Sequence, residues 1–371
     1  MEPYSVQYLE GKISEIKKQF NCAKCGGDLE YNPEVSSLEC PFCGKINKIE
    51  KGNKEIKEKD YEKFLEELEE KEAVIEQKTS ECNSCGSVFS VDPDTISTEC
   101  PYCDTPIVLH DKISTIVRPA GIHPFRITIE KAKEKFTKWL RKRWFLPSEM
   151  KEMTFPGKKL TGIYLPYWTY DADSISYYSG ERGVKKKTTK SYSVMENGQN
   201  VTKSKLEYYT DWNHTSGVVF HPFNDLLIPA GKTIPDKFNE LIKPWKLKDI
   251  SPFKEEYLSG FRAEKYSIGV KEGFTAAKGK MEQKINELIR KDIGGDEQRI
   301  HNVNSTYDKI SFKHILLPLW MSSYRYKDKV YRFVINGVTG EVQGNRPWSK
   351  WKLLFMFTMI GLIIAGLIIL L

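Results

Sequence analysis

The 371-residue sequence predicts an α+β protein made of three kinds of part. Two identical cysteine frames near the N-terminus predict two small β-ribbons, each closed around a metal ion. Aromatic and β-branched residues that surround two helix-like stretches predict a mixed α+β domain in the middle of the chain. The last nineteen residues carry no charge, which predicts one membrane-spanning helix.

All eight cysteines belong to the two frames, which lie sixty residues apart. Each frame has two Cys-x-x-Cys pairs separated by fourteen residues. Four thiolates in this arrangement close a tetrahedron around one Zn²⁺ ion and leave no position for water or substrate. We therefore predict two structural zinc ions, held by Cys22, Cys25, Cys40 and Cys43 in the first ribbon and by Cys82, Cys85, Cys100 and Cys103 in the second.

Other residues of the frames recur with the cysteines. Gly26 and Gly86 each follow the second cysteine, where the chain needs a residue that tolerates positive φ. Pro33 and Pro93 each mark the turn between the two pairs. The alternative is a disulfide framework, but a large lysine-rich chain without a signal peptide favours reduced, metal-bound cysteines.

The apolar C-terminal stretch, residues 353–371, is long enough to cross a bilayer. At 1.5 Å per residue it spans about 28 Å, against roughly 30 Å of hydrocarbon. Its thirteen Leu, Ile and Phe residues favour insertion by on the order of 6 kcal/mol. A buried core helix is the alternative, and it would need protein on all of its faces.

The residues before this stretch predict its orientation. Trp348 and Trp351 stand where an interfacial aromatic belt belongs. Positive charge lies on the N-terminal flank, at Arg346, Lys350 and Lys352, which predicts a single-pass protein of the cell membrane with its N-terminal bulk in the cytoplasm. Gly361 and Ala365 could let two such helices pack closely, so oligomerisation stays open.

The composition divides the chain into six segments. We expect an N-terminal lead at 1–20, zinc ribbons at 21–49 and 80–110, a charged helical linker at 50–79, an α+β domain at 111–349 and a transmembrane helix at 350–371.

The linker predicts one amphipathic helix. Tyr61, Phe64, Leu65, Leu68 and Ile75 recur at steps of three or four residues. We expect this narrow apolar stripe to pack on the ribbons. A helix that binds a partner protein is the alternative.

The central domain shows a second repeat. Leu165-Pro166-Tyr167-Trp168 and Leu317-Pro318-Leu319-Trp320 each follow a predicted helix and each precede a predicted hairpin. We therefore expect two lobes of related topology at 122–245 and 255–345. The expected helices are 128–145 and 276–293; the expected strands of the two copies are 169–178, 322–326 and 330–335, with a turn at Asn336-Gly337.

Several shorter elements complete the domain. Residues 218–229 and 266–270 are predicted strands, 235–242 a short helix, and Lys185 to Lys190 the polar tip of a loop. The basic side chains of the helix at 128–145 are expected to be a solvated face over a packed core, with an anion-binding face as the alternative.

No catalytic constellation is visible in the sequence. The segment Ala230-Gly231-Lys232-Thr233 is not a phosphate-binding loop, because Leu226 stands where the first glycine is required. The six histidines are scattered, and no cysteine remains for nucleophilic catalysis. Asp171 and Asp173 lie close enough to bind a metal, but such acids usually lie in turns. We expect a protein that is not an enzyme.

Four segments, together with the cysteine frames, resemble one bacterial family. The chain is similar over nearly its whole length to TFIIB-type zinc-ribbon-containing proteins, some of which are labelled primosomal protein N′ or replication-restart helicases. The helicase label does not extend to this chain, which has no Walker A loop. The segments are 162–173 (GIYLPYWTYDAD), 223–230 (FNDLLIPA), 258–266 (LSGFRAEKY) and 335–344 (INGVTGEVQG).

Two functions remain open on these grounds. The first is a membrane-anchored cytoplasmic scaffold, and the resemblance implies envelope-stress assemblies with flotillin-like (SPFH) and phage-shock-protein-A-like partners. The second is nucleic-acid binding, which the net charge of +7 permits. It is less favoured, because the second ribbon carries acidic residues, and the basic surplus beyond residue 130 can face anionic lipid instead.

Overall fold

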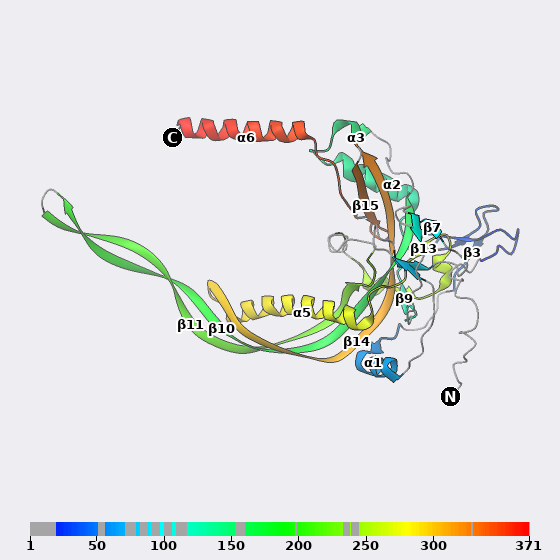
Figure 1. Cartoon of the computed structure of the whole chain (residues 1–371), viewed down its shortest axis with the longest axis horizontal. Coiled ribbons are helices and arrows are strands. Elements are labelled where there is room, and N and C mark those ends of the chain that lie inside the picture. Colours follow the sequence, from blue (N-terminus) through cyan, green and yellow to red (C-terminus); the bar gives the residue numbers. More distant parts are fainter. Residues whose placement is uncertain are drawn as a thin grey trace.

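A computed structural model describes residues 20–50, 56–70, 79–81, 88–90, 97–99, 106–108, 117–152, 160–196, 199–232, 238, 245–327 and 329–370. Figure 1 shows an elongated molecule whose body lies at one end and from which a long curved two-stranded arm projects. Residues 1–19 of the predicted lead at 1–20, and almost all of the predicted helix at 235–242, lie outside the described residues. The four cysteines of the second frame lie outside them as well, although strands β5 (Thr79–Glu81), β6 (Val88–Ser90), β7 (Ser97–Glu99) and β8 (Pro106–Val108) border that frame.

One large sheet, antiparallel except where the short strands β9 and β13 pair parallel, organises the body. Its main strands lie in the order β11-β10-β14-β15-β16. Short strands attach at its margins: β9 (Gly121–Ile122) beside β14 and β13 (Arg262–Ala263) beside β10. The main strands are β10 (Thr161–Glu196), β11 (Gln199–Pro229), β14 (Glu297–Tyr326), β15 (Lys329–Asn336) and β16 (Val342–Gly344), and β12 (Ser251–Pro252) pairs with β9.

The strands are longer than the sequence indicates. The predicted strand 169–178 is one part of the 36-residue β10, and the predicted strand 218–229 is the end of β11. The loop tip predicted at Lys185 to Lys190 is wrong. These residues continue β10 and pair with β11, with Lys190 opposite Lys205. Ion pairs from Lys186 to Asp211 (2.5 Å) and from Lys190 to Glu207 (2.7 Å) join the two strands there.

The strand predicted at 266–270 is also wrong, because this segment is the loop that leads into a helix. The amides of Ser267 and Ile268 both donate to the carbonyl oxygen of Ala230, at 2.8 and 3.0 Å. The backbone amides of this loop are therefore satisfied by the Ala230 carbonyl and not by pairing with a strand of the sheet.

Two amphipathic helices cover the sheet. Helix α2 (Ile129–Arg141) begins at Thr128, whose Oγ1 accepts from the amide of Lys131 at 3.4 Å. Its buried Phe136 stacks on Phe333 of β15, with ring centroids 3.8 Å apart. Helix α5 (Val270–Ile293) lies along β10 and β11. The helices expected at 128–145 and 276–293 are thus present with shifted ends.

The two predicted lobes make matching hydrogen bonds. The indole of Trp168 donates to the carbonyl of Ile268, and the indole of Trp320 donates to that of Ile127, both at 2.8 Å. Between these tryptophans, β10 and β14 pair antiparallel, with Leu165 opposite Leu317. Helix α5 covers β10 and β11, and α2 covers β14 to β16, so each helix packs on strands of the other predicted lobe.

We expected the linker stripe to pack on the ribbons, but its described residues Tyr61, Phe64 and Leu65 pack on the sheet, while Ile75 and most of the second ribbon lie outside the described residues. Helix α1 (Tyr61–Glu70) follows β4 (Lys59–Asp60), which pairs with β14. The Tyr61 ring lies 4.6 Å from that of Phe274, and the Phe64 ring lies 5.0 Å from that of Phe312. The sheet offers a larger apolar surface than a small ribbon does, so burial there stabilises the helix more.

At the C-terminus, α6 (Lys350–Leu370) leaves the body beside α3 (Ser148–Glu152) (Figure 1). Of the helices within the described ranges, it is the one that is long and apolar enough to cross a membrane, and no part of its apolar stretch is buried in the protein.

We predict that Tyr61→Ala lowers the free energy of unfolding by about 3 kcal/mol, because it leaves a cavity among three aromatic rings. Denaturant unfolding of the full chain in detergent measures the change. The matched control is Tyr192→Ala on the exposed arm, which we expect to have little effect. Equal stability of the two variants would contradict the docking of α1.

Candidate functional site: a cysteine cage and the groove beside it

The first cysteine frame folds into a small three-stranded ribbon. Its strands β1 (Glu30–Asn32), β2 (Ser37–Glu39) and β3 (Ile46–Asn47) pair antiparallel in chain order. One cysteine pair precedes β1 and the other lies between β2 and β3. Antiparallel pairing brings the two pairs to the same end of the ribbon.

Four sulfur atoms meet at this end. The Sγ atoms of Cys22 and Cys43 lie 3.6 Å apart, and those of Cys25 and Cys40 lie 3.5 Å apart. All four lie within 4.8 Å of one another. Zn–S bonds of about 2.3 Å in a tetrahedron place neighbouring sulfurs roughly 3.8 Å apart. All four cysteines are free rather than disulfide-bonded, so this cysteine cage can hold one metal ion.

The backbone around the cage supports thiolate ligands. Gly26 has a φ of 75° and its amide donates to the carbonyl of Cys22 at 2.8 Å, as the sequence predicts. The amide of Lys24 donates to the Cys22 Sγ at 3.4 Å and lowers the pKa of that thiol to about 6, while the neighbouring Cys40 sulfur raises the pKa of Cys25. A lowered pKa favours the deprotonated form that binds metal.

Gly44 plays the same part in the second half of the cage. Its φ is 68° and its amide donates to the carbonyl of Cys40 at 2.9 Å. The sequence analysis missed this residue. The signal was its position directly after Cys43, which matches the position of Gly26 after Cys25.

The ribbon is firmly attached to the α+β body. The amide of Tyr31 donates to the carbonyl of Ser259 at 3.1 Å, and the Ser259 hydroxyl donates to the carbonyl of Leu29 at 2.5 Å. The Tyr31 ring packs edge-on against Tyr257, in the short helix η3 (Glu255–Leu258). Cys22 and Cys40 belong to the same buried cluster as these rings. The cage therefore sets the position of the ribbon on the body.

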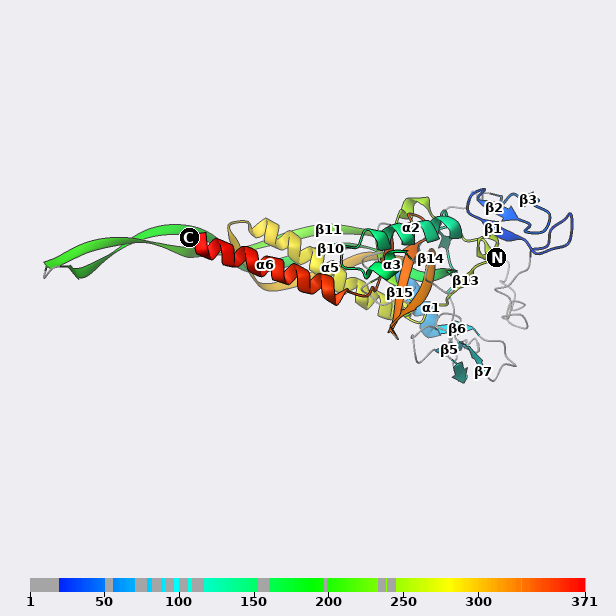
Figure 2. The same ribbon diagram turned by 90° about the horizontal axis from the view of Figure 1, so that it is seen from above.

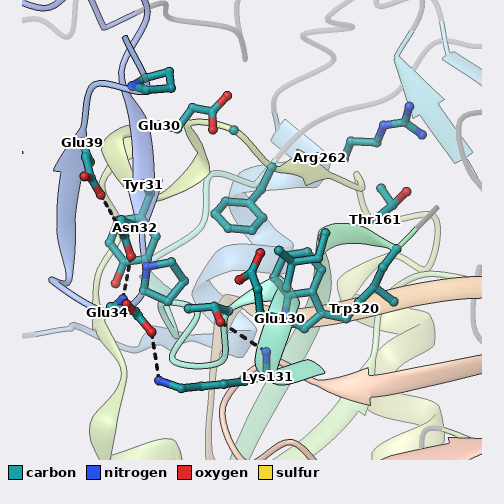
Figure 3. A pocket seen from close by; sticks show the side chains of 18 residues that line it. Glu30, Tyr31, Asn32, Glu34, Glu39, Glu130, Lys131, Thr161, Arg262 and Trp320 are labelled. Atoms are coloured by element: carbon teal, nitrogen blue, oxygen red, sulfur yellow. Dashed lines mark hydrogen bonds and ion pairs between the residues drawn. The ribbon is translucent and has the colours of Figure 1, made fainter. Parts of the chain in front are cut away.

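A groove of about 780 Å³ lies between the ribbon and the body (Figure 3). Phe261 and Trp320 provide apolar surface, and an ion pair of 3.0 Å between Lys131 and Glu34 joins its two sides. The groove is lined by residues 30–34, 39 and 41 of the ribbon, 128–131 at the start of α2, 160–162 at the start of β10, 260–262, and Trp320.

The lining carries more negative than positive charge. Four glutamates face two cations, Lys131 and Arg262. Glu34 is paired with Lys131, and the side-chain amide of Asn32 donates a hydrogen bond to the carboxylate of Glu39. Glu30 and Glu130 are exposed and form no ion pair with any residue that the structure describes (Figure 3). The groove can therefore accept a cation beside an apolar group.

A second group of carboxylates surrounds a lysine. The Lys313 Nζ lies 2.8 Å from Glu58 and 2.6 Å from Asp225, and its side chain is only 14% exposed. Burial and the nearby Glu58 raise the pKa of Asp171 to about 6. The Lys313 ammonium offsets one of the three negative charges. The carboxylate oxygens of Glu58, Asp171 and Asp225 lie within 4.8 Å of one another, so the cluster is an ion-pair network that keeps a net negative charge. Asp173, predicted beside Asp171, pairs with Lys309 instead.

Two histidines are buried in the body without a catalytic partner among the residues that the structure describes. The Nδ1 of His314 lies 2.8 Å from the carbonyl of Val117, and burial lowers the pKa of His314 to about 4. Burial likewise lowers the pKa of His123. Both imidazoles are neutral at pH 7 and fill core positions.

The chain is similar to an uncharacterized protein, YdjG, of Bacillus subtilis (strain 168). The two are 29% identical over 353 residues, which cover 92% of this chain and 94% of the relative. No protein-family profile matches the chain, and no solved structure does.

We predict that Lys313→Met lowers the free energy of unfolding at pH 7 by about 2 kcal/mol, because it leaves Glu58 and Asp225 without a counter-ion. The neighbouring Lys313 depresses the pKa of Glu58, so this stabilisation exists above the ordinary carboxyl pKa and is lost as pH falls through the folded pKa. The difference from wild type should therefore shrink below about pH 4.

Thermal unfolding between pH 3.5 and pH 8, an interval around the ordinary carboxyl pKa of roughly 4, measures this dependence. Lys309→Met is the control, since that lysine is 84% exposed where it pairs with Asp173. A loss of stability that does not change with pH would contradict the ion-pair account.

Proposed function

We propose that this protein is a membrane-anchored cytoplasmic scaffold that binds a partner protein in the groove beside its cysteine cage. The observation that carries the proposal is the groove itself. It lies between a metal-held ribbon and the body, on a chain that ends in an exposed apolar helix. A closed cage of four cysteines has no open ligand position, so it supports a binding surface rather than hydrolysis.

The metal proposed is Zn²⁺, one ion in each ribbon. Four thiolates in a tetrahedron are the ligand set of structural zinc sites. The distances among the first four sulfurs support one ion there. The second ion rests on the repeated sequence frame, whose cysteines lie outside the described residues. Reduced thiolates also agree with a cytoplasmic location.

The membrane anchor proposed is α6. Trp348 and Trp351 are exposed at its start, where they suit the interface between lipid and water. Positive charge before the helix favours a cytoplasmic body. An anchor of this kind confines the protein to the plane of the bilayer, where a scaffold collects its partners.

The groove indicates the chemistry of the partner. Unpaired Glu30 and Glu130 favour a lysine or arginine side chain, while Phe261 and Trp320 favour an adjacent apolar residue. A basic segment of a partner protein supplies both. Flotillin-like (SPFH) and phage-shock-protein-A-like proteins are the partners that the family resemblance implies, and their recruitment is proposed on that ground.

We also infer that the two lobes of the body are copies of one unit. A second pair of matched bonds supports this, since Ala230 donates to Pro166 at 3.0 Å and Gly337 donates to Pro318 at 2.9 Å. The exchanged helices lock the two copies into one rigid block. Such a block holds the ribbon and the anchor at a constant separation, as a scaffold requires.

Photo-crosslinking tests the groove. We predict that a benzophenone amino acid at Thr161, on the rim, crosslinks the full-length chain in its native membranes to a basic segment of one protein. The double variant Glu30→Lys and Glu130→Lys should reduce the adduct at least tenfold, because a like charge across a binding surface costs more than about 1.4 kcal/mol.

Glu287→Lys is the control, because this exposed glutamate of α5 lies outside the groove. Adducts that survive the groove variant would contradict the proposal. A chain that binds duplex DNA with strong salt dependence, and crosslinks to no protein, would contradict it as well.

Zinc content tests the cages. We predict two zinc ions per purified chain, and one in either Cys40→Ser or Cys100→Ser. Cys40→Ser should also abolish the crosslink at Thr161 and Cys100→Ser should not, because among the described residues the first ribbon lines the groove. Metal-free protein with disulfide-bonded cysteines, or equal crosslinking in both variants, would overturn this expectation.

A further inference from the structure

The first turn of α6 is held against the segment that follows α2. The amide of Ser349 donates to the carbonyl of Phe145 at 2.8 Å, and the Lys352 ammonium donates to the carbonyl of Leu146, also at 2.8 Å. The ring of Trp348 stacks on that of Phe145, with centroids 5.8 Å apart. In both Figure 1 and Figure 2, α6 starts beside α3, which comes directly after this segment. The end of α2 is therefore fixed next to the start of the apolar helix.

The two stretches that meet here carry positive charge and no acid. We call residues 141–146 and 346–352 together the basic corner; they contain six cations and no Asp or Glu. None of the six forms an ion pair with a residue that the structure describes. Indole rings accompany the charges, with Trp144 70% and Trp351 81% exposed. The cations are Arg141, Lys142, Arg143, Arg346, Lys350 and Lys352.

Two of these cations, Arg143 and Arg346, lie near each other. The guanidinium carbon of Arg143 is 5.1 Å from the ring centroid of Trp139, and that of Arg346 is 4.7 Å from the ring centroid of Trp348. Burial and then the positive charge of Arg143 lower the pKa of Arg346, although both groups stay charged at pH 7. Within the described part of the chain, the buried Nε of Arg143 has no hydrogen-bond partner. An anion between the two groups would relieve their repulsion.

We propose that Arg143 and Arg346 bind the phosphate of an anionic phospholipid headgroup beside α6. A guanidinium group matches a phosphate with two parallel N–H···O bonds, so two such groups can hold one headgroup from two sides. The exposed Trp144 and Trp351 suit the interface between headgroups and hydrocarbon. The inference rests on the membrane anchor of the proposed function and adds to it a lipid class and a binding site.

The attachment of the basic corner to α6 selects lipid over other carriers of negative charge. The first turn of a spanning helix lies among the headgroups, because the hydrocarbon core begins in the apolar stretch that follows. Phe145 contacts Trp348 directly before α6, so Arg143 lies at the same level. A nucleic acid or an acidic protein would have to displace headgroups to reach the two arginines.

Native mass spectrometry of the full-length chain tests the site. The chain is inserted into nanodiscs of equal parts phosphatidylglycerol and phosphatidylcholine, and the lipids that stay bound after release are identified. We expect phosphatidylglycerol to be retained in preference to phosphatidylcholine. Arg143→Gln and Arg346→Gln should each lower this preference about fivefold, because one cation beside an anionic lipid has an effect of this size.

Two further variants make the test specific. Arg118→Gln removes the same charge from an exposed arginine that pairs with Glu255 on the ribbon side of the body, and it should leave the preference unchanged. The double variant Arg143→Lys and Arg346→Lys keeps the charge but loses the two-bond geometry, so its preference should fall between those of wild type and the glutamine variants. A lysine variant that equals wild type would overturn the guanidinium site.

The remaining outcomes separate the source of the phosphate and the anchor. Equal retention of both lipids by wild type, or an equal loss in Arg118→Gln, would overturn the inference. Inorganic phosphate is titrated calorimetrically into phosphatidylcholine nanodiscs that hold the chain. Binding that Arg143→Gln abolishes, without a preference for phosphatidylglycerol, would assign the site to free phosphate and overturn the lipid assignment.

Insertion into the nanodisc is read separately from the lipid preference. If all variants insert and none prefers phosphatidylglycerol, the lipid site is overturned and the anchor of the proposed function stands. A wild-type chain that does not insert at all would remove the anchor, and the lipid site with it.

Discussion

The pairing of β10 with β14 is the interaction on which the rest of the structure depends. It joins the two lobes antiparallel, from Thr161 opposite Met321 to Gly183 opposite Glu297. Both strands are covered on both faces near Leu165 and Leu317, which explains why the sequence there is almost continuously apolar. Helix α2 shares a buried cluster with β14, β15 and β16, and α5 shares one with β10 and β11, so each cluster joins segments that lie far apart in the chain.

The first ribbon, the linker helix and the arm are each attached to this pair of strands in a different way. The first ribbon reaches it through the loop at Ser259, whose hydroxyl donates to the carbonyl of Leu29. The linker reaches it through β4 and Tyr61. The arm is the continuation of β10 and β11 beyond the last residue that β14 can pair. The groove, the apolar helix and the arm thus lie at different places around one sheet.

Local sequence signals predicted the helices well and the strands poorly. Helix α2 follows from Thr128 as a cap and from the spacing of Ala132, Phe136 and Leu140, all of which are local. The stretch from Lys185 to Lys190 has no apolar alternation, so it read as a loop. Cross-strand pairing with β11 keeps it extended, and that partner lies more than ten residues away. The apolar stripe of the linker was predicted, but the surface on which it packs was not, because distant segments of the chain form that surface in the folded sheet.

By itself, the sequence determined the ligand set of the cage and the apolar character of the last helix, since both depend on residue type and short spacing. The positive φ of Gly26 belongs with them. Only the tertiary structure decided the groove and the arm. The groove draws on segments from Glu30 to Trp320, and the arm exists because three strands end at different lengths. The separation of residues along the chain does not show which distant segments will lie together, because that depends on which strands pair and in which register.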